Sequence, residues 1–255
     1  TPSHLSSIDY GMAYKGGDRL GGFSSGYGAS GIIYKTFSAT NGTESASGWP
    51  GQTMPMDIGG GIAIDENGYF FICNASYSNS TTYGCKIKVS RAVGSVYTYD
   101  VTTINGLSPA VLEGDGGARV GYGIDVKRDS SGVGFALITA TAGVAASAVN
   151  TGVLYIPITA GADLAHPTFG SAVKLTIANL GGGVRVRIID DTHFWIDGAD
   201  TRPKLVTVTN WTTPTFTVAE FPVVTGGPNA TVRTDVADFN FKGERFVLMG
   251  TNYIN

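Results

Sequence analysis

Five side chains that could ligate a metal ion fall within eleven residues of the sequence: Asp190, Asp191, His193, Asp197 and Asp200. Calcium prefers such carboxylate oxygens, but the spacing does not match the D-x-[DN]-x-[DN]-G loop that binds it. Acidic residues are also typical of turns, so we interpret Asp190-Asp191 and Asp197-Gly198 as connections between strands. We therefore predict no metal site.

Two glycine patterns match motifs of catalysis and nucleotide binding. Residues 22–26 (GFSSG) match G-x-S-x-G, and residues 26–31 (GYGASG) match G-x-G-x-x-G. Both motifs need a helix to follow them, at whose N-terminus the nucleophile or the pyrophosphate is placed. Residues 30–37 (SGIIYKTF) instead have the apolar character of a strand. We predict a glycine-rich hairpin here, no nucleophilic role for Ser24 and no bound cofactor.

Residues for acid–base catalysis are few. The three histidines, His4, His166 and His193, do not stand near a serine or cysteine in a nucleophilic arrangement. Four aspartates open equivalent segments or lie close to their starts: Asp9, Asp57, Asp125 and Asp238. Two of these could form the carboxylate pair of a glycoside hydrolase, but that depends on a spatial separation which the sequence does not give. Catalysis stays an alternative, and we favour a non-enzymatic role.

Tryptophans are candidate sugar contacts, because a flat indole can stack on the apolar face of a sugar ring. Trp49 lies in a Gly/Ser-rich stretch and Trp211 at the end of an apolar segment, so both are predicted ligand contacts. Packing between neighbouring sheets is the alternative for both. Trp195 alternates with Phe194 and Ile196, which indicates a core position.

These residues must be positioned by a repeated element. A small residue, an alternating apolar segment, a polar turn and a more apolar segment recur in residues 10–25, 60–75, 122–139, 182–198 and 236–252. The copies start 50 to 62 residues apart, which is a loose period typical of repeat architectures. Within this pattern Asn67-Gly68 predicts a two-residue hairpin turn.

Further strands follow the hairpin in each complete unit. A third is predicted in residues 30–37, 85–90, 151–159 and 203–211, and a fourth in residues 96–101, 173–177 and 216–221. Four antiparallel strands per unit make a blade, so we predict an all-β chain that forms a β-propeller. About five blade starts are visible, and the last blade is incomplete.

The innermost strand of each blade borders the central channel of a propeller. Polar side chains alternate with apolar ones in these predicted strands: Asp125 and Lys127, Arg185 and Arg187, Asp238 and Asn240. Such a side chain either reaches the channel or is hydrogen-bonded by a neighbouring blade. We favour the structural role for these side chains, and Asp125 and Arg185 are the candidate ligand contacts among them.

Residues 1–255 are predicted to be one propeller domain, since β-rich single domains often reach this length. The fifth unit ends after its second strand, which would expose a sheet edge. Either residues 4–8 complete that blade, or the chain is a fragment of a larger ring. We expect the fragment, with further blades from the same precursor or another chain.

The charge and hydropathy exclude two partner classes. The formal net charge is −3, and the few Lys and Arg residues are spread singly, so we expect no nucleic-acid partner. No apolar run approaches the ~20 residues that cross a bilayer, so we expect no transmembrane segment. Charged residues make up only 15%, and glycine is abundant with 37 residues, as suits short strands joined by tight turns.

Two cysteines indicate in which redox environment the protein could reside. Cys73 and Cys85 fall in the two arms of one predicted hairpin and could form a disulfide, which would imply an oxidising environment. Two buried free thiols are the alternative. Five Asn-x-Ser/Thr sequons begin at Asn41, Asn74, Asn79, Asn210 and Asn229, and they permit glycosylation only in a host that performs it.

With its Gly/Thr-rich strands, loose blade period and low charge, the chain resembles secreted β-propeller repeat proteins and is similar to uncharacterised propeller lipoproteins of gut Bacteroidota. The resemblance implies a secreted, periplasmic or cell-surface protein whose loops bind glycans or proteins, with no cofactor. We therefore predict a non-catalytic binding module for carbohydrate or protein. The alternatives are a propeller-type glycoside hydrolase or lyase, and a structural component of a surface protein.

Overall fold

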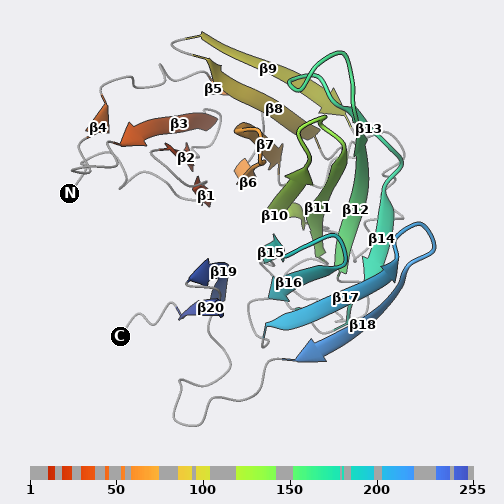
Figure 1. The fold of residues 1–255 in the computed structure, drawn as a ribbon. Coiled ribbons are helices and arrows are strands. Elements are labelled where there is room, and N and C mark those ends of the chain that lie inside the picture. Colours follow the sequence, from red (N-terminus) through yellow and green to blue (C-terminus); the bar gives the residue numbers. More distant parts are fainter. Residues whose placement is uncertain are drawn as a thin grey trace.

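The computed structural model describes a set of β-strands and the turns that join some of them (Figure 1). The described residues are 11–14, 19–24, 30–37, 44–45, 53–54, 59–74, 86–93, 96–103, 119–141, 152–178, 180, 185–197, 203–220, 234–241 and 244–251. Within these ranges every regular element is a strand, and no helix that could span a membrane occurs. This agrees with the all-β prediction.

The five repeated hairpins of the sequence each form the first two strands of a sheet. The first strands are β1 (Gly11–Tyr14), β6 (Gly59–Ile64), β10 (Arg119–Arg128), β15 (Arg185–Ile188) and β19 (Thr234–Phe241). The second strands are β2 (Arg19–Ser24), β7 (Tyr69–Asn74), β11 (Gly134–Thr141), β16 (His193–Asp197) and β20 (Glu244–Thr251).

The remaining strands extend four of these hairpins outward. The third strands are β3 (Ser30–Phe37), β8 (Lys86–Val93), β12 (Gly152–Thr159) and β17 (Lys204–Asn210). The outer strands are β4 (Glu44–Ser45), β5 (Thr53–Met54), β9 (Val96–Thr103), β13 (Thr168–Phe169), β14 (Val173–Thr176) and β18 (Thr215–Glu220). All pairings are antiparallel, and β3 and β12 each pair with two short outer strands.

We call the five sheets blades 1 to 5 in chain order, so that blade 1 begins with β1 and blade 5 consists of β19 and β20. The first strands of successive blades contact one another, from β1 to β6, β10, β15 and β19. Figure 1 shows them innermost, with the other strands of each blade farther from a common centre. This radial arrangement of antiparallel sheets is a β-propeller, as predicted.

The described core lies between blades, because alternate residues of a strand point to opposite faces of its sheet. In β11, Ala136 and Ile138 pack toward blade 2, whereas Phe135 and Leu137 pack toward blade 4. Blade 3 is thus apolar on both faces. Burial of one such large apolar side chain is worth about 1.5 to 3 kcal/mol, so these two interfaces hold blades 2, 3 and 4 together.

The hairpin at Asn67-Gly68 is present, but its loop is longer than the two residues predicted. Asp65 N–H donates to the Tyr69 carbonyl at 2.9 Å, which leaves residues 66–68 as a three-residue loop. Gly68 has a φ of 80°, the left-handed position that closes such a loop beside a bulge. Gly132, with a φ of 86°, closes the hairpin between β10 and β11 in the same way. The glycine therefore ends the loop.

Candidate functional site

The turns between the first and second strands of blades 2, 3 and 4 share one hydrogen-bonding pattern. Each begins with an aspartate whose side chain accepts backbone N–H groups of the residues that follow. Asp65 accepts from Asn67 and Tyr69, Asp129 from Ser131 and Val133, and Asp190 from Thr192 and His193, at 2.7 to 3.1 Å. A carboxylate that is used in this way holds its turn in one conformation.

Asp65 also joins blade 2 to blade 3. Its second oxygen accepts a 2.6 Å hydrogen bond from Arg128 Nε and forms an ion pair with the Arg128 guanidinium, and both side chains are 0% exposed. Arg128 lies beside the Phe71 ring at 4.7 Å from its centroid and donates to the Leu164 carbonyl at 3.0 Å. A buried charge needs such a set of partners, so this pair fixes the position of one blade against the other.

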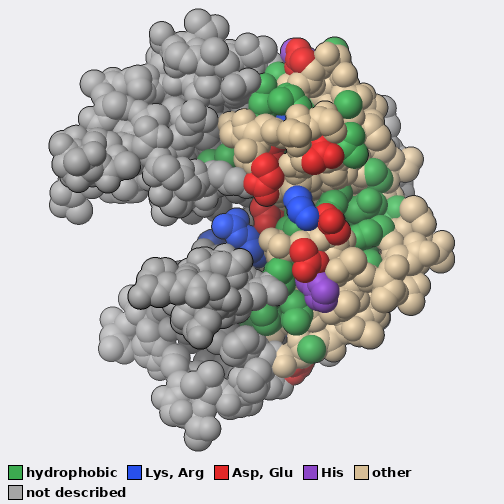
Figure 2. Space-filling model, in the orientation of Figure 1, with side chains coloured by type: hydrophobic (Ala, Val, Ile, Leu, Met, Phe, Trp, Pro, Cys, Tyr) green, Lys and Arg blue, Asp and Glu red, His purple; other side chains and the backbone are tan. Residues whose placement is uncertain are grey.

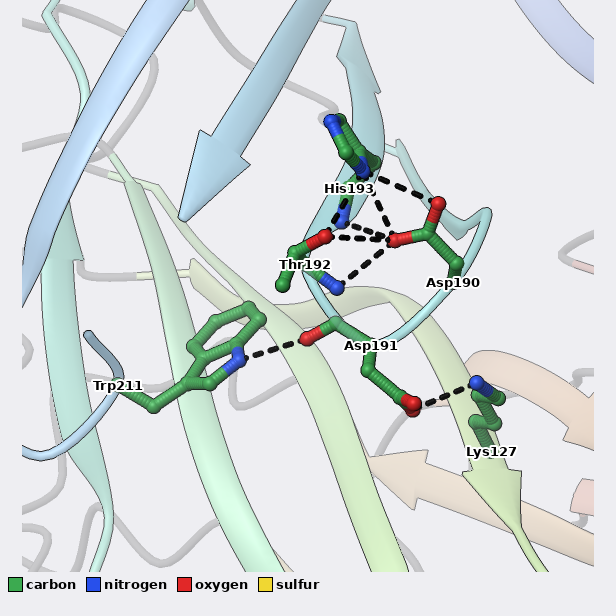
Figure 3. Close-up of polar contacts among 6 residues, drawn as sticks. All are labelled: Lys127, Asp190, Asp191, Thr192, His193 and Trp211. Carbon is green, nitrogen blue, oxygen red and sulfur yellow. Dashed lines mark hydrogen bonds and ion pairs between the residues drawn. The ribbon is translucent and has the colours of Figure 1, made fainter. Parts of the chain in front are cut away.

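Blades 3 and 4 are joined by two charged contacts. Asp125, 7% exposed, accepts the backbone N–H of Val126 at 3.0 Å and that of Ile188 at 2.7 Å. Ile188 belongs to β15, the innermost strand of blade 4, whose inner edge pairs with no other strand of that blade. Asp125 therefore accepts the hydrogen bond of an edge N–H group that strand pairing leaves without a partner. Lys127 Nζ donates to Asp191 Oδ1 at 2.5 Å (Figure 3).

Trp211 completes the contact between these two blades. Its indole stacks on Tyr155 with ring centroids 4.5 Å apart and an interplanar angle of 16°, and it also lies against Phe135 and Phe194. Its Nε1–H donates to the Asp191 carbonyl at 2.9 Å (Figure 3). Burial raises the pKa of Tyr155. Trp211 therefore packs between blades while part of it remains exposed.

A hydroxyl, an imidazole and a carboxylate meet at the turn of blade 4. His193 Nδ1 lies 2.9 Å from Asp190 Oδ1 and 2.9 Å from Thr192 Oγ1 (Figure 3). A catalytic triad uses the two ring nitrogens in series, with the nucleophile on one and the carboxylate on the other. Here both groups meet the same nitrogen, so the arrangement stabilises the turn and does not activate Thr192.

The hydrogen bonds at this turn change the acidity of Asp190. Partial burial opposes ionisation, but bonds from the N–H groups of Thr192 and His193, the Thr192 hydroxyl and the His193 ring outweigh it. Together they lower the pKa of Asp190 to about 2 from the usual 3.8. Asp163 shows the same pattern, because His166 and the N–H of Ala165 lower its pKa. Both carboxylates are ionised at neutral pH.

This lowered pKa predicts a pH-dependent stability. A carboxyl with a lower pKa in the folded state stabilises the protein above its unfolded value, and the stabilisation is lost as the pH falls through the folded value. For Asp190 that window runs from pH 3.8 down to about 2. We expect Asp190→Asn to lower the melting temperature at pH 5 and the difference from the unchanged protein to shrink by pH 2.5. A difference that is constant over this range would contradict the assignment.

The structure places the predicted ligand contacts in different locations. Asp125 is buried beside Arg187, whereas Arg185 is exposed at the start of β15. Trp211 follows the end of β17, at the opposite end of blade 4 from Arg185, so these two do not form one small site. Trp49 lies outside the described residues. Trp195 is 8% exposed, as predicted for a core position.

Other predictions have mixed outcomes. Asp190-Asp191 does form the turn between β15 and β16, as predicted. No group of three or more His, Cys, Asp or Glu side chains that could hold a metal occurs among the residues that the structure describes. Strands β7 and β8 form the hairpin predicted around the cysteines, but Cys85 lies outside the described ranges, so the disulfide stays a prediction.

The pair of Asp65 and Arg128 was not predicted from the sequence. The signal was present, since Arg128 alternates with Val126 and Ile124 in a strand whose apolar residues are buried. A charged residue in such a position requires a buried partner. The partner lies 63 residues away in the neighbouring blade, where no local pattern identifies it.

Comparisons with known proteins show a likeness in fold. No protein-family model matches the chain, and no curated protein matches it in sequence. A protein from Lactobacillus plantarum aligns with a TM-score of 0.53 and 14% identity over 94% of this chain and 64% of its own. Trypanosoma rangeli sialidase in complex with sialic acid aligns with a TM-score of 0.49 and 11% identity over 94% of this chain and 42% of its own.

A polysaccharide lyase, Uly1, aligns with a TM-score of 0.47 and 12% identity over 92% of this chain and 52% of its own. The chain thus spans less than two thirds of the length of each of these proteins. At such identity the likeness to the Lactobacillus plantarum protein concerns the fold alone. By its described sheets, the chain is a β-propeller.

Proposed function

We propose that this protein is a non-catalytic binding module that recognises carbohydrate on a propeller scaffold. The observation that carries the proposal is the use of the described carboxylates on the inner strands and their turns. Asp65, Asp125, Asp129 and Asp190 each accept backbone N–H groups, and Asp65 and Asp125 also contact an arginine of the blade interfaces. These carboxylates therefore stabilise the turns and the contacts between blades.

The acidity of the turn carboxylates does not suit them to the role of a general acid. A general acid at neutral pH needs a carboxyl whose pKa is raised, so that it still carries its proton. The pKa values of Asp129, Asp163 and Asp190 are lowered, by hydrogen bonds from Ser131, from His166 and within the blade 4 turn respectively. Asp9, Asp57 and Asp238, the other carboxylates considered for a glycoside hydrolase pair, have side chains that lie outside the described part of the chain.

The neutral polar surface of blade 4 supports a carbohydrate ligand. Exposed hydroxyl and amide side chains follow one another along β17, β18 and the turn between them: Thr209, Asn210, Thr212, Thr213, Thr215 and Thr217. Such groups donate and accept hydrogen bonds without a charge, which matches the hydroxyl groups of a sugar. Trp49, Trp211 and Arg185 remain the proposed ligand contacts, whereas the buried Asp125 fits a structural role between blades 3 and 4. A secreted, periplasmic or cell-surface location remains the proposed setting.

A glycan-array screen of the purified chain tests the proposal. We expect binding to a restricted set of glycans, and we expect Trp49→Ala or Arg185→Gln to weaken it at least about tenfold, as the loss of one good contact does. Lys174→Gln on the outer strand β14 removes a charge elsewhere and should leave binding unchanged. No glycan binding by the folded protein would overturn the carbohydrate assignment in favour of a protein partner.

A further inference from the structure

The inner strand of blade 4 carries an exposed cation that donates no hydrogen bond to the described residues. Arg187 lies on β15, where Val186 is buried and Ile188 packs on the core between blades 3 and 4, so Arg187 points to the other face. Its side chain is 45% exposed. Figure 2 shows basic side chains at the edge of the central hollow.

The one ionic contact of Arg187 within the described residues is loose. Its Nη1 lies 3.7 Å from Asp125 Oδ1, which is beyond hydrogen-bond distance. Asp125 is held by the backbone N–H groups of Val126 and Ile188 and does not depend on Arg187. The negative charge of Asp125 therefore attracts the Arg187 guanidinium, but the N–H donors of Arg187 stay available to a ligand.

Arg187 differs from three other described cations, which lie close to a carboxylate. Lys127 is held by Asp191 at 2.5 Å, Lys204 by Glu220 at 2.6 Å, and Arg128 is buried against Asp65. Each of these charges has a close carboxylate partner. The guanidinium of Arg187 has no such partner within the described ranges.

A guanidinium with available donors selects for a particular ligand group. Its planar fork of N–H donors matches the two oxygens of a carboxylate, and such bidentate pairs are stronger than neutral hydrogen bonds. Arg185 lies two residues earlier on the same exposed side of β15. Lys127, Asp125, Asp190 and Asp191 are the other described charges around this strand, and Lys127 is held by Asp191. The preference for an anion therefore rests on the N–H donors of Arg187.

We propose that the hollow beside β15 binds the carboxylate of an acidic sugar, and that Arg187 forms the hydrogen bonds to this carboxylate. This inference rests on the proposed carbohydrate-binding function and makes it more specific. The ligand would be a uronate-containing oligosaccharide whose carboxylate meets the fork of Arg187 and whose negative charge also interacts with Arg185.

The experiment compares each uronate oligosaccharide with its own methyl ester, which keeps the sugar and removes the charge. We expect the acid to bind at least about tenfold more tightly than the ester, as one charge-assisted contact provides. Arg187→Gln should abolish this preference, Arg187→Lys should restore part of it because the charge returns without the fork, and Lys174→Gln should leave it unchanged. The preference should also decline with added salt.

The outcomes separate the two proposals. Equal binding of acid and ester would overturn the carboxylate site and leave the carbohydrate module intact. An acid preference that survives in Arg187→Gln would place the site elsewhere and overturn the role of Arg187. Binding of neither acid nor ester nor any neutral glycan would overturn the proposed function and this inference together. Circular dichroism and melting curves of each variant confirm that the fold is retained in these comparisons.

Discussion

Replacing Asp65 by asparagine is expected to lower the free energy of unfolding by about 3 to 5 kcal/mol, the usual cost of stranding one member of a buried ion pair. Asparagine keeps the side-chain oxygen that accepts N–H from Asn67 and Tyr69, so the turn retains its bonds. The substitution removes the negative charge that faces Arg128, and both side chains of this pair are fully buried. Urea unfolding at pH 7 measures the difference.

A matched control and a second variant separate the ion pair from the turn. Asp129→Asn makes the same change in the equivalent turn of blade 3, where the side chain bonds to Ser131 and Val133 and meets no buried cation. It should cost much less than the change at Asp65, because surface substitutions away from a buried charge have small effects. Adding Arg128→Met to Asp65→Asn should recover much of the loss, because an unpaired charge is removed. Equal costs at Asp65 and Asp129 would refute the role of the pair.

Trp211→Ala is expected to destabilise the protein by about 2 to 4 kcal/mol, near the lower end of the range for aromatic truncation because the side chain is partly exposed. The change removes the stack on Tyr155 and the hydrogen bond to the Asp191 carbonyl. Trp211→Phe keeps part of the stack and should cost less. Thermal and urea unfolding measure both effects.

The same variants test Trp211 as a ligand contact. If Trp211→Ala leaves stability unchanged and abolishes glycan binding, the indole serves mainly as a binding platform and the packing role is wrong. If stability falls and Trp211→Phe retains both the fold and glycan binding, the indole serves the interface between blades 3 and 4. Both measurements are needed on the same protein preparation.

The sequence predicted the parts of this fold that depend on neighbouring residues. The hairpins β6–β7 and β10–β11 were recognisable because an apolar strand, a glycine-containing turn and a second strand follow one another in residues 60–75 and 122–139. The loop at Asn67-Gly68 was predicted too short, since the same residues fit a two-residue turn and a three-residue loop that ends in a left-handed glycine. The hydrogen bond from the Asp65 N–H to the Tyr69 carbonyl distinguishes the longer loop from the two-residue turn. The residue types alone are compatible with both.

The candidate site was harder to predict because its contacts cross between blades. Asp125 was recognised as polar among apolar residues, but its acceptor role toward Ile188 joins residues 63 positions apart. Arg187 was identified only as one of several polar residues on the inner strands. Its available donors follow from the distance to Asp125, which depends on how blades 3 and 4 are packed against each other.

The most direct test of the account is a paired binding and turnover measurement on one glycan. The protein would be incubated with an oligosaccharide that it retains on the array, and the bound and free sugar would be analysed by mass spectrometry after prolonged incubation at pH 4, 5.5 and 7. We predict that the sugar is retained and recovered with its mass unchanged at every pH. Cleaved or unsaturated products that form in proportion to protein concentration would show a hydrolase or lyase and contradict the non-catalytic module.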